Sequence, residues 1–486
     1  MATFDLVVKG GTVATAADVV GADIGVAGGR IAALGHDLEG ARTIDARGKL
    51  VLPGGVDPHC HIEQASAAGV LNADSFASAT ASAARGGTTT VVPFVAQHRG
   101  ASLADAAADY HARAARGAIV DYALHLILAD PRPEVLADEL PPLVEAGHGS
   151  LKIFLTYDDI RLDDHQALAV LEAARRHGLM VCIHAENDAM IVWLRERLIA
   201  RGHRDARFHA TSHPRVGEAE AVHRAIALAR LLDQPVMIFH VSCVEALDEI
   251  RRARAQGVKI FAETCTHYLT LTRAALARDG GAGAKWICSP PLREPADQEA
   301  LWRALEDGTL ATVSSDHAPY AADETGKFQA GEAPAFTQVP NGLPGLAFRL
   351  PLLFDAMVSR GRLDLESFVR LTATAPARLY NLHDRKGSIA IGKDADLAIW
   401  DPERRVSLTH ALAGDATGYT PFEGLEVTGW PVTTLRRGEV VAQDGEVQAR
   451  PGTGRFLPRR GGKAAHPSGR TVAEMDAGRN FGAELL

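Results

Sequence analysis

The sequence predicts an α/β protein in which a (β/α)₈ TIM-like barrel carries a small β-sandwich built from the N- and C-terminal segments. Between residues 53 and 385, short apolar strands alternate with Ala-, Leu- and Arg-rich helical segments, and eight strand–helix units can be counted. Both ends of the chain consist of short strands with Gly turns, and chain termini often lie close together. A doubly wound open sheet is the alternative, and the count of eight favours the barrel.

The predicted parts follow in order along the chain. Residues 1–52 form the first part of the β-sandwich, residues 53–385 the barrel, and residues 386–450 the rest of the sandwich, with strands such as KGSIAIGKDADLAIWDP. Residues 451–486 are rich in Gly, Pro and Arg. This segment is either a disordered tail or a C-terminal arm at a subunit interface.

The barrel strands are expected in eight apolar stretches: VLPGGVDPHC, TTTVVPFV, YALHLILA, SLKIFLTY, MVCIHAEN, PVMIFHVS, KIFAETCTHYL and LATVSSDHAP.

Composition excludes several classes of function. The net charge is −9 and the main body has no long basic stripe, which argues against nucleic acid and gives no reason to expect a membrane surface. We find neither a secretory signal pattern at the start nor an apolar run long enough to span a bilayer. The five cysteines are widely spaced and form no CxxC pair, which predicts a reducing, cytoplasmic environment.

Metal-ligating side chains gather near the C-terminal ends of the predicted strands, where barrels place their chemistry. They are His59, His61, His184, His240 and Asp316. His59 and His61 share one face of an extended chain, whereas Cys60 points away. A lone histidine on a strand is more often a core residue, but four histidines and an aspartate at strand exits favour a metal site.

Lys152 stands alone among apolar residues in GSLKIFLTY. It could face solvent on an edge strand, because a buried unpaired ammonium is costly. However, four imidazoles and a carboxylate exceed what one zinc needs, and two metals need a bridging anion. A neutral lysine amine can add carbon dioxide, and the carbamate offers two oxygens like a glutamate. We therefore expect N6-carboxylated Lys152 to bridge two divalent metals, and the strand to begin before Ser150.

Several motifs together identify a resemblance: PGGVDPHCH, SLKIFLTY, IHAEN, FHVS, ETCTHYL, SPPLR, SSDHAP and NGLPG. The chain resembles the dihydropyrimidinase/hydantoinase group of cyclic amidohydrolases, in the amidohydrolase superfamily, from KGGTVAT to GKDADLAIWD. The resemblance implies a metal-binding barrel joined to a small β-sandwich, and a binuclear site, usually zinc, with a carboxylated lysine. It also implies a homotetramer, with a homodimer as the alternative.

The expected reaction is hydrolytic ring opening of a small cyclic amide, a dihydropyrimidine or a 5-substituted hydantoin, by a hydroxide that bridges the metals. Two ligand sets are expected: His59, His61, Lys152 and Asp316 for the more buried metal, and Lys152, His184 and His240 for the other. Asp316 would also take the proton of the hydroxide and pass it to the departing ring nitrogen.

Three further residues match positions that bind substrate in similar enzymes. Tyr157, five residues beyond Lys152, matches a tyrosine whose hydroxyl would stabilise the developing oxyanion. Ser289 and Asn341 match positions whose backbone groups bind the amide ring. Each of the three could instead be an ordinary loop or interface residue.

Other polar residues of the barrel strands are interpreted as structural. His125, His267 and His317 lie on or near strands, and His317 directly follows Asp316, so alternation points it elsewhere. Cys265 and His267 are two apart, a spacing that rarely gives a productive thiol–imidazole pair.

Relatives with the same ligands define the alternatives. Dihydroorotases carry an arginine just after the HxH pair, whereas this chain has Ile62-Glu63-Gln64, which counts against an anionic ring. The small residues of Glu63–Gly69 predict a roomier or differently shaped pocket. An allantoinase-like or cyclic-imide hydrolase remains open. Non-enzymatic scaffolds such as the collapsin response mediator proteins lose metal ligands, and all six are present here.

Overall fold

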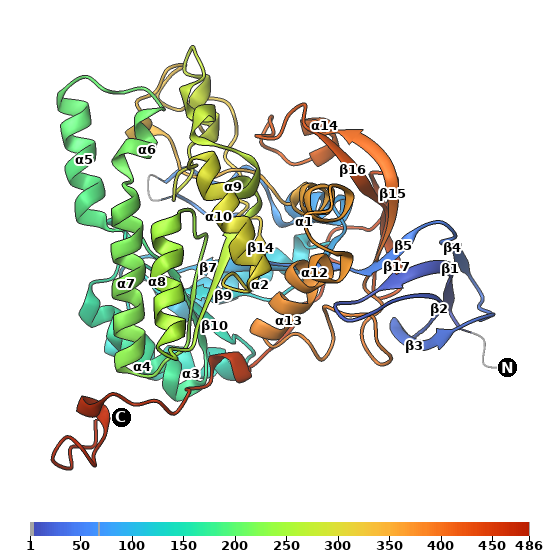
Figure 1. Ribbon diagram of the computed structural model, residues 1–486, viewed down its shortest axis with the longest axis horizontal. Coiled ribbons are helices and arrows are strands. Elements are labelled where there is room, and N and C mark those ends of the chain that lie inside the picture. Colours follow the sequence, from blue (N-terminus) through green and yellow to red (C-terminus); the bar gives the residue numbers. More distant parts are fainter. Residues whose placement is uncertain (1–3, 67–68, 486) are drawn as a thin grey trace.

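The protein is described from a computed structural model that covers residues 4–66 and 69–485. Its helices and strands form two bodies, a barrel and a sheet beside it (Figure 1). The sheet lies at one side of the barrel, and strands from both ends of the chain build it. This is the predicted fold class.

Eight parallel strands form a nearly closed barrel. In chain order they are β6 (Gly55–Cys60), β7 (Thr88–Ala96), β9 (His125–Ile127), β10 (Ser150–Phe154), β11 (Met180–His184), β12 (Val236–Ile238), β13 (Ile260–Cys265) and β14 (Thr312–Ser314), and the short β8 (Asp121–Tyr122) pairs with β7. Beyond β14, the His61 N–H donates to the His317 carbonyl at 2.6 Å, which joins the last strand to the first.

Most helices cover the outside of the barrel, and the last one lies beside the second sheet (Figure 1). They are α1 (Phe76–Arg85), α2 (Leu103–Gly117), α3 (Leu140–Glu145), α4 (Asp164–His177), α5 (Asp188–Ala200), α6 (Phe208–Ser212), α7 (Arg215–Leu231), α8 (Val244–Ala255), α9 (Thr266–Thr270), α10 (Pro295–Glu306), α11 (Arg349–Phe354), α12 (Leu365–Val369), α13 (Ala375–Leu379) and α14 (His410–Ala413). Their sequences show why they form. For example, Asp163 and Gln166 make a capping box at the start of α4, and Gly178, with a φ of 65°, ends it.

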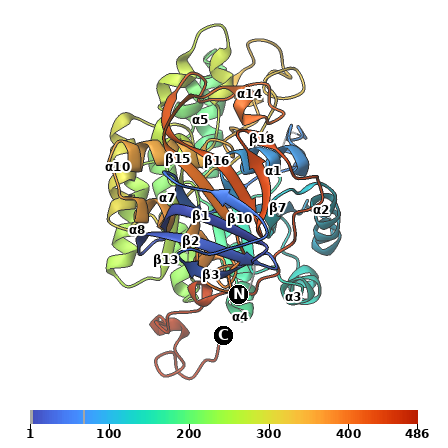
Figure 2. The ribbon, with the colours of Figure 1, turned by 90° about the vertical axis from the view of Figure 1, so that its right-hand side faces the viewer.

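The second sheet combines strands from both ends of the chain. Its strands are β1 (Leu6–Ala14), β2 (Val19–Ala27), β3 (Arg30–Gly35), β4 (Thr43–Asp45), β5 (Leu50–Pro53), β15 (Leu397–Ser407), β16 (Glu426–Arg436), β17 (Glu439–Gln443) and β18 (Glu446–Val447). The two ends meet where β5 pairs antiparallel with β15. Figure 2 shows this sheet facing the viewer, with blue N-terminal strands beside orange and red C-terminal strands.

A buried charge cluster joins the barrel to the sheet. The Lys386 ammonium lies 2.7 Å from an oxygen of Asp121, 3.0 Å from Asp394 and 2.6 Å from Asp396. Asp121 belongs to β8, beside the barrel, whereas Asp396 directly precedes β15. One lysine therefore ties both bodies together.

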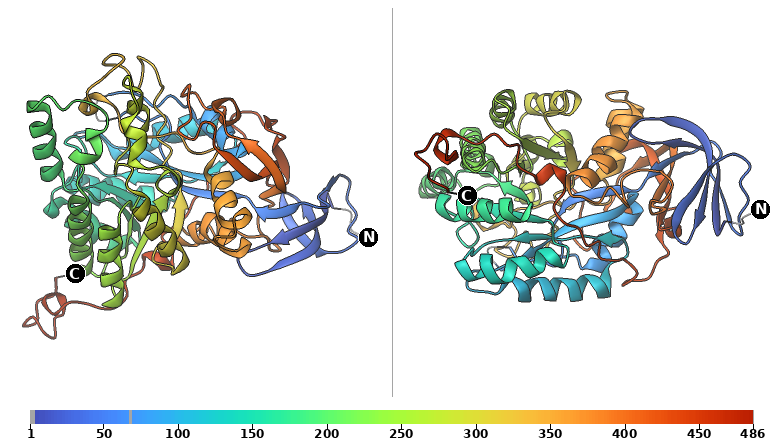
Figure 3. Two further views of the ribbon diagram at one scale, coloured as in Figure 1. Left: turned by 45° about the horizontal axis from the view of Figure 1, so that its top comes forward. Right: turned by 90° about the horizontal axis from the view of Figure 1, so that it is seen from below.

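The C-terminal arm crosses the end of the barrel where the strands begin (Figure 3). The Leu457 N–H donates to the Tyr122 carbonyl at 2.7 Å. Arg459 is buried, and its guanidinium donates to the Leu124 carbonyl at 3.3 Å and the Ser150 hydroxyl at 2.7 Å. This arm covers the strand starts, so the opposite end of the barrel is left to carry the site.

In the described part of the chain, no helix has the length and apolar character needed to cross a membrane.

Candidate metal centre

A cavity of about 520 Å³ opens at the C-terminal ends of the barrel strands. All nine residues singled out in the sequence line it: His59, His61, Lys152, Tyr157, His184, His240, Ser289, Asp316 and Asn341. They come from five barrel strands or the turns that follow them and from two loops, all far apart in the chain. The fold therefore brings the whole predicted set to one place.

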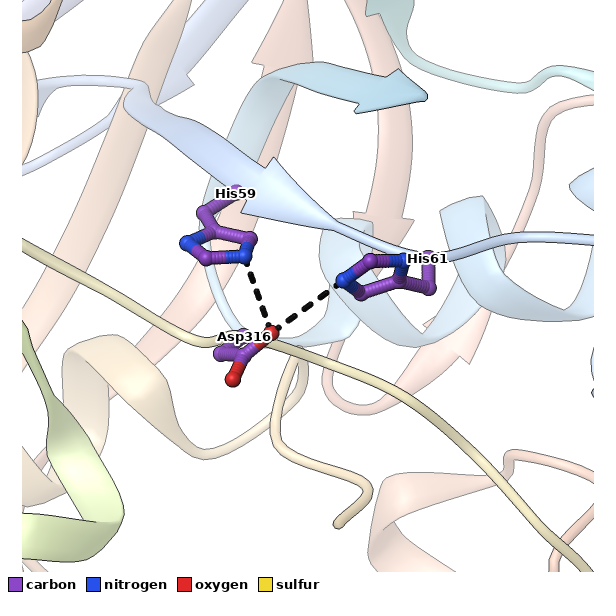
Figure 4. Close-up of side chains that lie close together, drawn as sticks. All are labelled: His59, His61 and Asp316. Carbon is purple, nitrogen blue, oxygen red and sulfur yellow. Dashed lines mark ion pairs between the residues drawn. The ribbon is translucent and has the colours of Figure 1, made fainter. Parts of the chain in front are cut away.

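His59, His61 and Asp316 form the tightest group (Figure 4). One Asp316 oxygen lies 3.0 Å from His59 Nε2 and 3.4 Å from His61 Nε2. Burial raises the pKa of the Asp316 carboxyl, but the two imidazoles outweigh it and hold this pKa well below its usual range. Cys60, between the two histidines, packs into the hydrophobic core, as alternation predicts.

Lys152 lies inside the barrel and has no exposed surface. Its ammonium is 4.1 Å from the centre of the Phe239 ring and 4.8 Å from that of Phe154, and no described residue offers it a hydrogen bond. Burial lowers its pKa to about 8. Because β10 lies between β9 and β11, the edge-strand alternative for Lys152 is excluded.

The expectation that this strand begins before Ser150 is wrong. β10 starts at Ser150, because Gly147, with a φ of 106°, still belongs to the turn that precedes the strand. Lys152 is thus the middle residue of a short strand.

His184 and His240 lie on the other side of the cavity, with ring centres 4.3 Å apart. Burial lowers the pKa of both imidazoles, which favours the neutral form that binds metals. His184 Nε2 is 2.8 Å from Glu186, and no described residue hydrogen-bonds to His240 Nδ1. His240 therefore keeps a buried nitrogen free for a ligand.

Three residues of this site have left-handed backbone conformations. Tyr157, His240 and Asp316 have φ values of 74°, 40° and 45°. Left-handed conformations cost non-glycine residues about 1–3 kcal/mol each and cluster at functional sites. Here each such residue lies two or three residues after the end of a barrel strand, and its side chain lines the cavity.

Tyr157, Ser289 and Asn341 form the wall beside the histidines. The Asn341 amide donates to the Tyr157 hydroxyl at 3.2 Å, and the Tyr157 ring packs edge-on against His184. Burial raises the pKa of the Tyr157 hydroxyl, so it stays protonated and able to donate. The Ser289 hydroxyl is buried and without a partner among the described residues.

Sequence reasoning missed several residues that orient the histidines. Glu263 Oε1 lies 2.5 Å from His59 Nδ1, Gln64 Oε1 2.7 Å from His61 Nδ1, and Glu186 bridges His184 and His213. Glu263 could have been found, since a lone acid within the apolar strand KIFAETC stands out as Lys152 does. Gln64 and Glu186 give no comparable signal, because they lie in loops.

The residues interpreted as structural are mostly held by other partners. His125 binds the Ser150 hydroxyl and the Pro58 carbonyl, and His317 binds Asp74 at 3.1 Å. His267 differs, because it lies with Cys265 and Asp316 in a second group of ligand atoms. Burial raises the pKa of the Cys265 thiol well above its usual range, which argues against a cysteine nucleophile.

The donor set fits divalent cations. It combines buried imidazoles, an ionised carboxylate and a buried lysine, and two of its nitrogens, Lys152 Nζ and His240 Nδ1, lack any partner among the described residues. Buried polar atoms without partners are rare unless they serve a ligand. Imidazole and carboxylate are the ligands that zinc prefers.

Comparisons with known proteins show what the whole chain is similar to. The model of the Amidohydrolase family matches residues 50–441. A D-hydantoinase of Ralstonia pickettii is 42% identical over 458 residues, covering 94% of this chain and 99% of that protein. A solved D-hydantoinase structure superposes with a TM-score of 0.91 at 41% identity, and the dihydropyrimidinase of Brevibacillus agri NCHU1002 with 0.91 at 37%. Each covers 94% of this chain and 99% of the other.

Proposed function

Because the chain belongs to the amidohydrolase family, as a cyclic amidohydrolase of the hydantoinase and dihydropyrimidinase type, we propose that it opens dihydropyrimidines or 5-substituted hydantoins by hydrolysis at two metals. The observation that carries this proposal is the buried Lys152 without a partner, enclosed by four histidines and Asp316 around one cavity.

The proposed site holds two divalent cations, zinc in this proposal. His59, His61, Asp316 and carboxylated Lys152 would bind one, and Lys152, His184 and His240 the other. When bound, such a pair activates water at neutral pH and polarises the carbonyl under attack. The low pKa of Lys152 supports carboxylation, since only the neutral amine adds carbon dioxide.

Side chains and backbone groups of the protein would transfer the proton, stabilise the oxyanion and align the ring. Asp316, ionised and fixed between His59 and His61, would accept the proton of the attacking water and return it to the leaving ring nitrogen. The Tyr157 hydroxyl, held by Asn341, would donate to the oxygen that gains charge. Backbone groups at Ser289 and Asn341 would align the amide ring.

The residues that follow the HxH pair, Glu63 and Gln64, favour a substrate whose ring carries no charge. Gln64 is bound to His61, and a Glu63 oxygen accepts from the N–H of Phe76 at the start of α1. No arginine therefore stands where dihydroorotases place one. Of the predicted roomy loop, Ala65 and Ser66 line the cavity, whereas residues 67–68 lie outside the described part.

We also propose that the protein is a homotetramer and that it works in the reducing cytoplasm. Helix α5 supports self-association, because Trp193 is 53% exposed and only Ile191 of this largely apolar helix is buried. The five cysteines are buried and unpaired, as a reducing environment allows. Light scattering on the purified protein would give the subunit number, and a monomer would contradict this part.

Turnover of a substrate panel tests the function. Metal-loaded protein is assayed on dihydrouracil, hydantoin, a 5-aryl-hydantoin, allantoin, dihydroorotate and a cyclic imide. Opening of the uncharged dihydropyrimidine and hydantoin rings is expected. Preference for allantoin or the imide would instead favour an allantoinase-like or a cyclic-imide hydrolase function. Failure to open any ring with both metals bound would refute the proposal.

Removal of the Lys152 amine tests the bridge. Lys152→Ala is expected to lower metal content and to reduce kcat/KM by about three orders of magnitude or more, because neither metal keeps its shared ligand. Metal analysis and the hydantoin assay measure this, with Lys285→Ala, outside the cavity, as the control. Carbon NMR after incubation with labelled bicarbonate would report the carbamate directly. Full metal content and turnover in Lys152→Ala would disprove the bridge.

A further inference from the structure

Arg195 reaches the same cavity from helix α5. This helix starts at Asp188, shortly after His184, and leads away from the barrel (Figure 1). Seven residues along a helix correspond to about 10 Å at 1.5 Å per residue. Arg195 therefore lines the outer part of the cavity rather than the metal centre.

Arg195 differs from the neighbouring arginines because its charge is not satisfied within the described chain. Arg161 pairs with Asp188 at 3.3 Å, and the Arg197 guanidinium lies 3.9 Å from the centre of the Trp193 ring. No described carboxylate lies within ion-pair distance of Arg195. Arg195 is thus a charged residue of the cavity wall that has no ion-pair partner among the described residues.

The rest of the outer wall carries no opposing charge. Asp316 is the one carboxylate among the described residues that line the cavity, and His59 and His61 engage it. The cavity is also lined by hydroxyl and amide side chains that can donate hydrogen bonds: Ser66, Tyr320, Gln329, Thr337 and Gln338. A cation that shares a cavity with neutral hydrogen-bond donors, and that has no described carboxylate within ion-pair distance, is suited to bind an anion.

We propose that Arg195 is an anion subsite that binds an acidic substituent of the substrate, so that the preferred ring is uncharged and carries a carboxylate on a short side chain. Arginine keeps its charge at all relevant pH values and can bind a carboxylate through two parallel hydrogen bonds. This proposal rests on the proposed ring opening and specifies its substrate class. It differs from an anionic ring, because the acid lies outside the ring and away from the metals.

The test compares two hydantoins that differ in one group, hydantoin-5-propanoate and the matching propanamide. For the metal-loaded wild type, kcat/KM is expected to be higher for the acid. In Arg195→Gln, the acid-to-amide ratio of kcat/KM should fall about 10–100-fold, as expected for hydrogen bonds to a charged group, mainly through KM. Arg197→Gln, two residues away on α5, is the matched control and should keep the wild-type ratio.

An unchanged ratio in Arg195→Gln would overturn the subsite. If the wild type opens neither ring, the proposed function fails, and calorimetry with hydantoin-5-propanoate then decides the subsite by itself. Weaker binding to Arg195→Gln than to wild type and Arg197→Gln would support it, whereas equal binding would overturn it.

Discussion

Lys152 and Glu263 place two ionisable groups inside a barrel that is otherwise largely apolar. Burial lowers the pKa of Lys152 to about 8 and raises that of Glu263, so burial works against the charged form of both groups. Each also keeps a buried atom without a hydrogen-bond partner among the described residues. A fold selected for stability alone would place apolar side chains here, so these residues indicate a site.

Glu263 is expected to position His59 for its metal. Its carboxylate fixes which ring nitrogen of His59 carries the proton, and such partners typically change metal affinity by about 10–100-fold. Glu263→Gln should therefore weaken metal binding by that factor, measured by competition with a chelator. Glu249→Gln removes a similar pair with His223 on the surface and should leave affinity unchanged. Equal affinity in both variants would contradict the role of Glu263.

Tyr157→Phe separates catalysis from metal binding. The variant keeps the ring that packs on His184 but loses the hydroxyl, so metal content should stay at the wild-type level. Loss of one oxyanion donor typically costs about 10²–10³ in kcat. Steady-state kinetics and metal analysis on the same preparation measure both. Loss of metal would show that Tyr157 shapes the centre instead.

At the scale of elements, one buried lysine connects the two loops beside Tyr157. Lys327 Nζ donates to the carbonyls of Ile287 at 2.7 Å and Pro340 at 2.8 Å, and burial lowers its pKa to about 7. Ile287 lies two residues before Ser289, and Pro340 directly precedes Asn341. The spacing of the two loops across the cavity therefore depends on this side chain.

Lys327→Met should loosen ring binding without removing the metals. The substitution keeps most of the volume but leaves two buried carbonyls without their donor, each costing about 1–3 kcal/mol. We expect KM for hydantoin to rise about tenfold or more, with kcat changed less. Lys327→Gln, which restores N–H donors, should recover part of the loss. Failure of Gln to improve on Met would point to packing instead.

At the scale of the molecule, the barrel and the sheet depend on the cluster around Lys386. Burial opposes the charge of Lys386, yet the surrounding carboxylates raise its pKa, and Lys386 and Arg437 lower that of Asp121 against burial. The lysine is therefore charged and fully engaged in the folded protein. Removing it would leave three carboxylates close together in a dry junction.

Lys386→Met should destabilise the protein by about 3–5 kcal/mol, the usual cost of breaking a buried ion pair from one side. Urea denaturation measures this. Lys49→Met is the matched control, since its pair with Asp401 has the same 2.6 Å distance but is partly exposed, and such pairs contribute less than about 1 kcal/mol. Similar losses in the two variants would show that the junction does not depend on the charge cluster.

Much of this arrangement could be predicted from sequence, because the signals for it lie within short stretches of the chain. The barrel strands are short apolar runs, and a ligand at a strand exit is visible as a polar residue where a run ends, as for His184. Glu186, Lys327 and Arg195 could not be found in this way. Their roles arise from loops and helices that the fold brings to the cavity, and no pattern in the adjacent sequence marks them.

The pairing of β5 with β15 also has a consequence for synthesis. Pro53 and Leu397 are partners in this ladder, so more than 340 residues must leave the ribosome before β5, which already has β1 on one side, acquires β15 on the other. At about 5–20 residues per second, that takes roughly 20–70 s. During this interval the nascent chain exposes an open strand edge that can pair with other chains. The newborn protein is therefore expected to need chaperone protection at its first fifty residues, long before the metal centre exists.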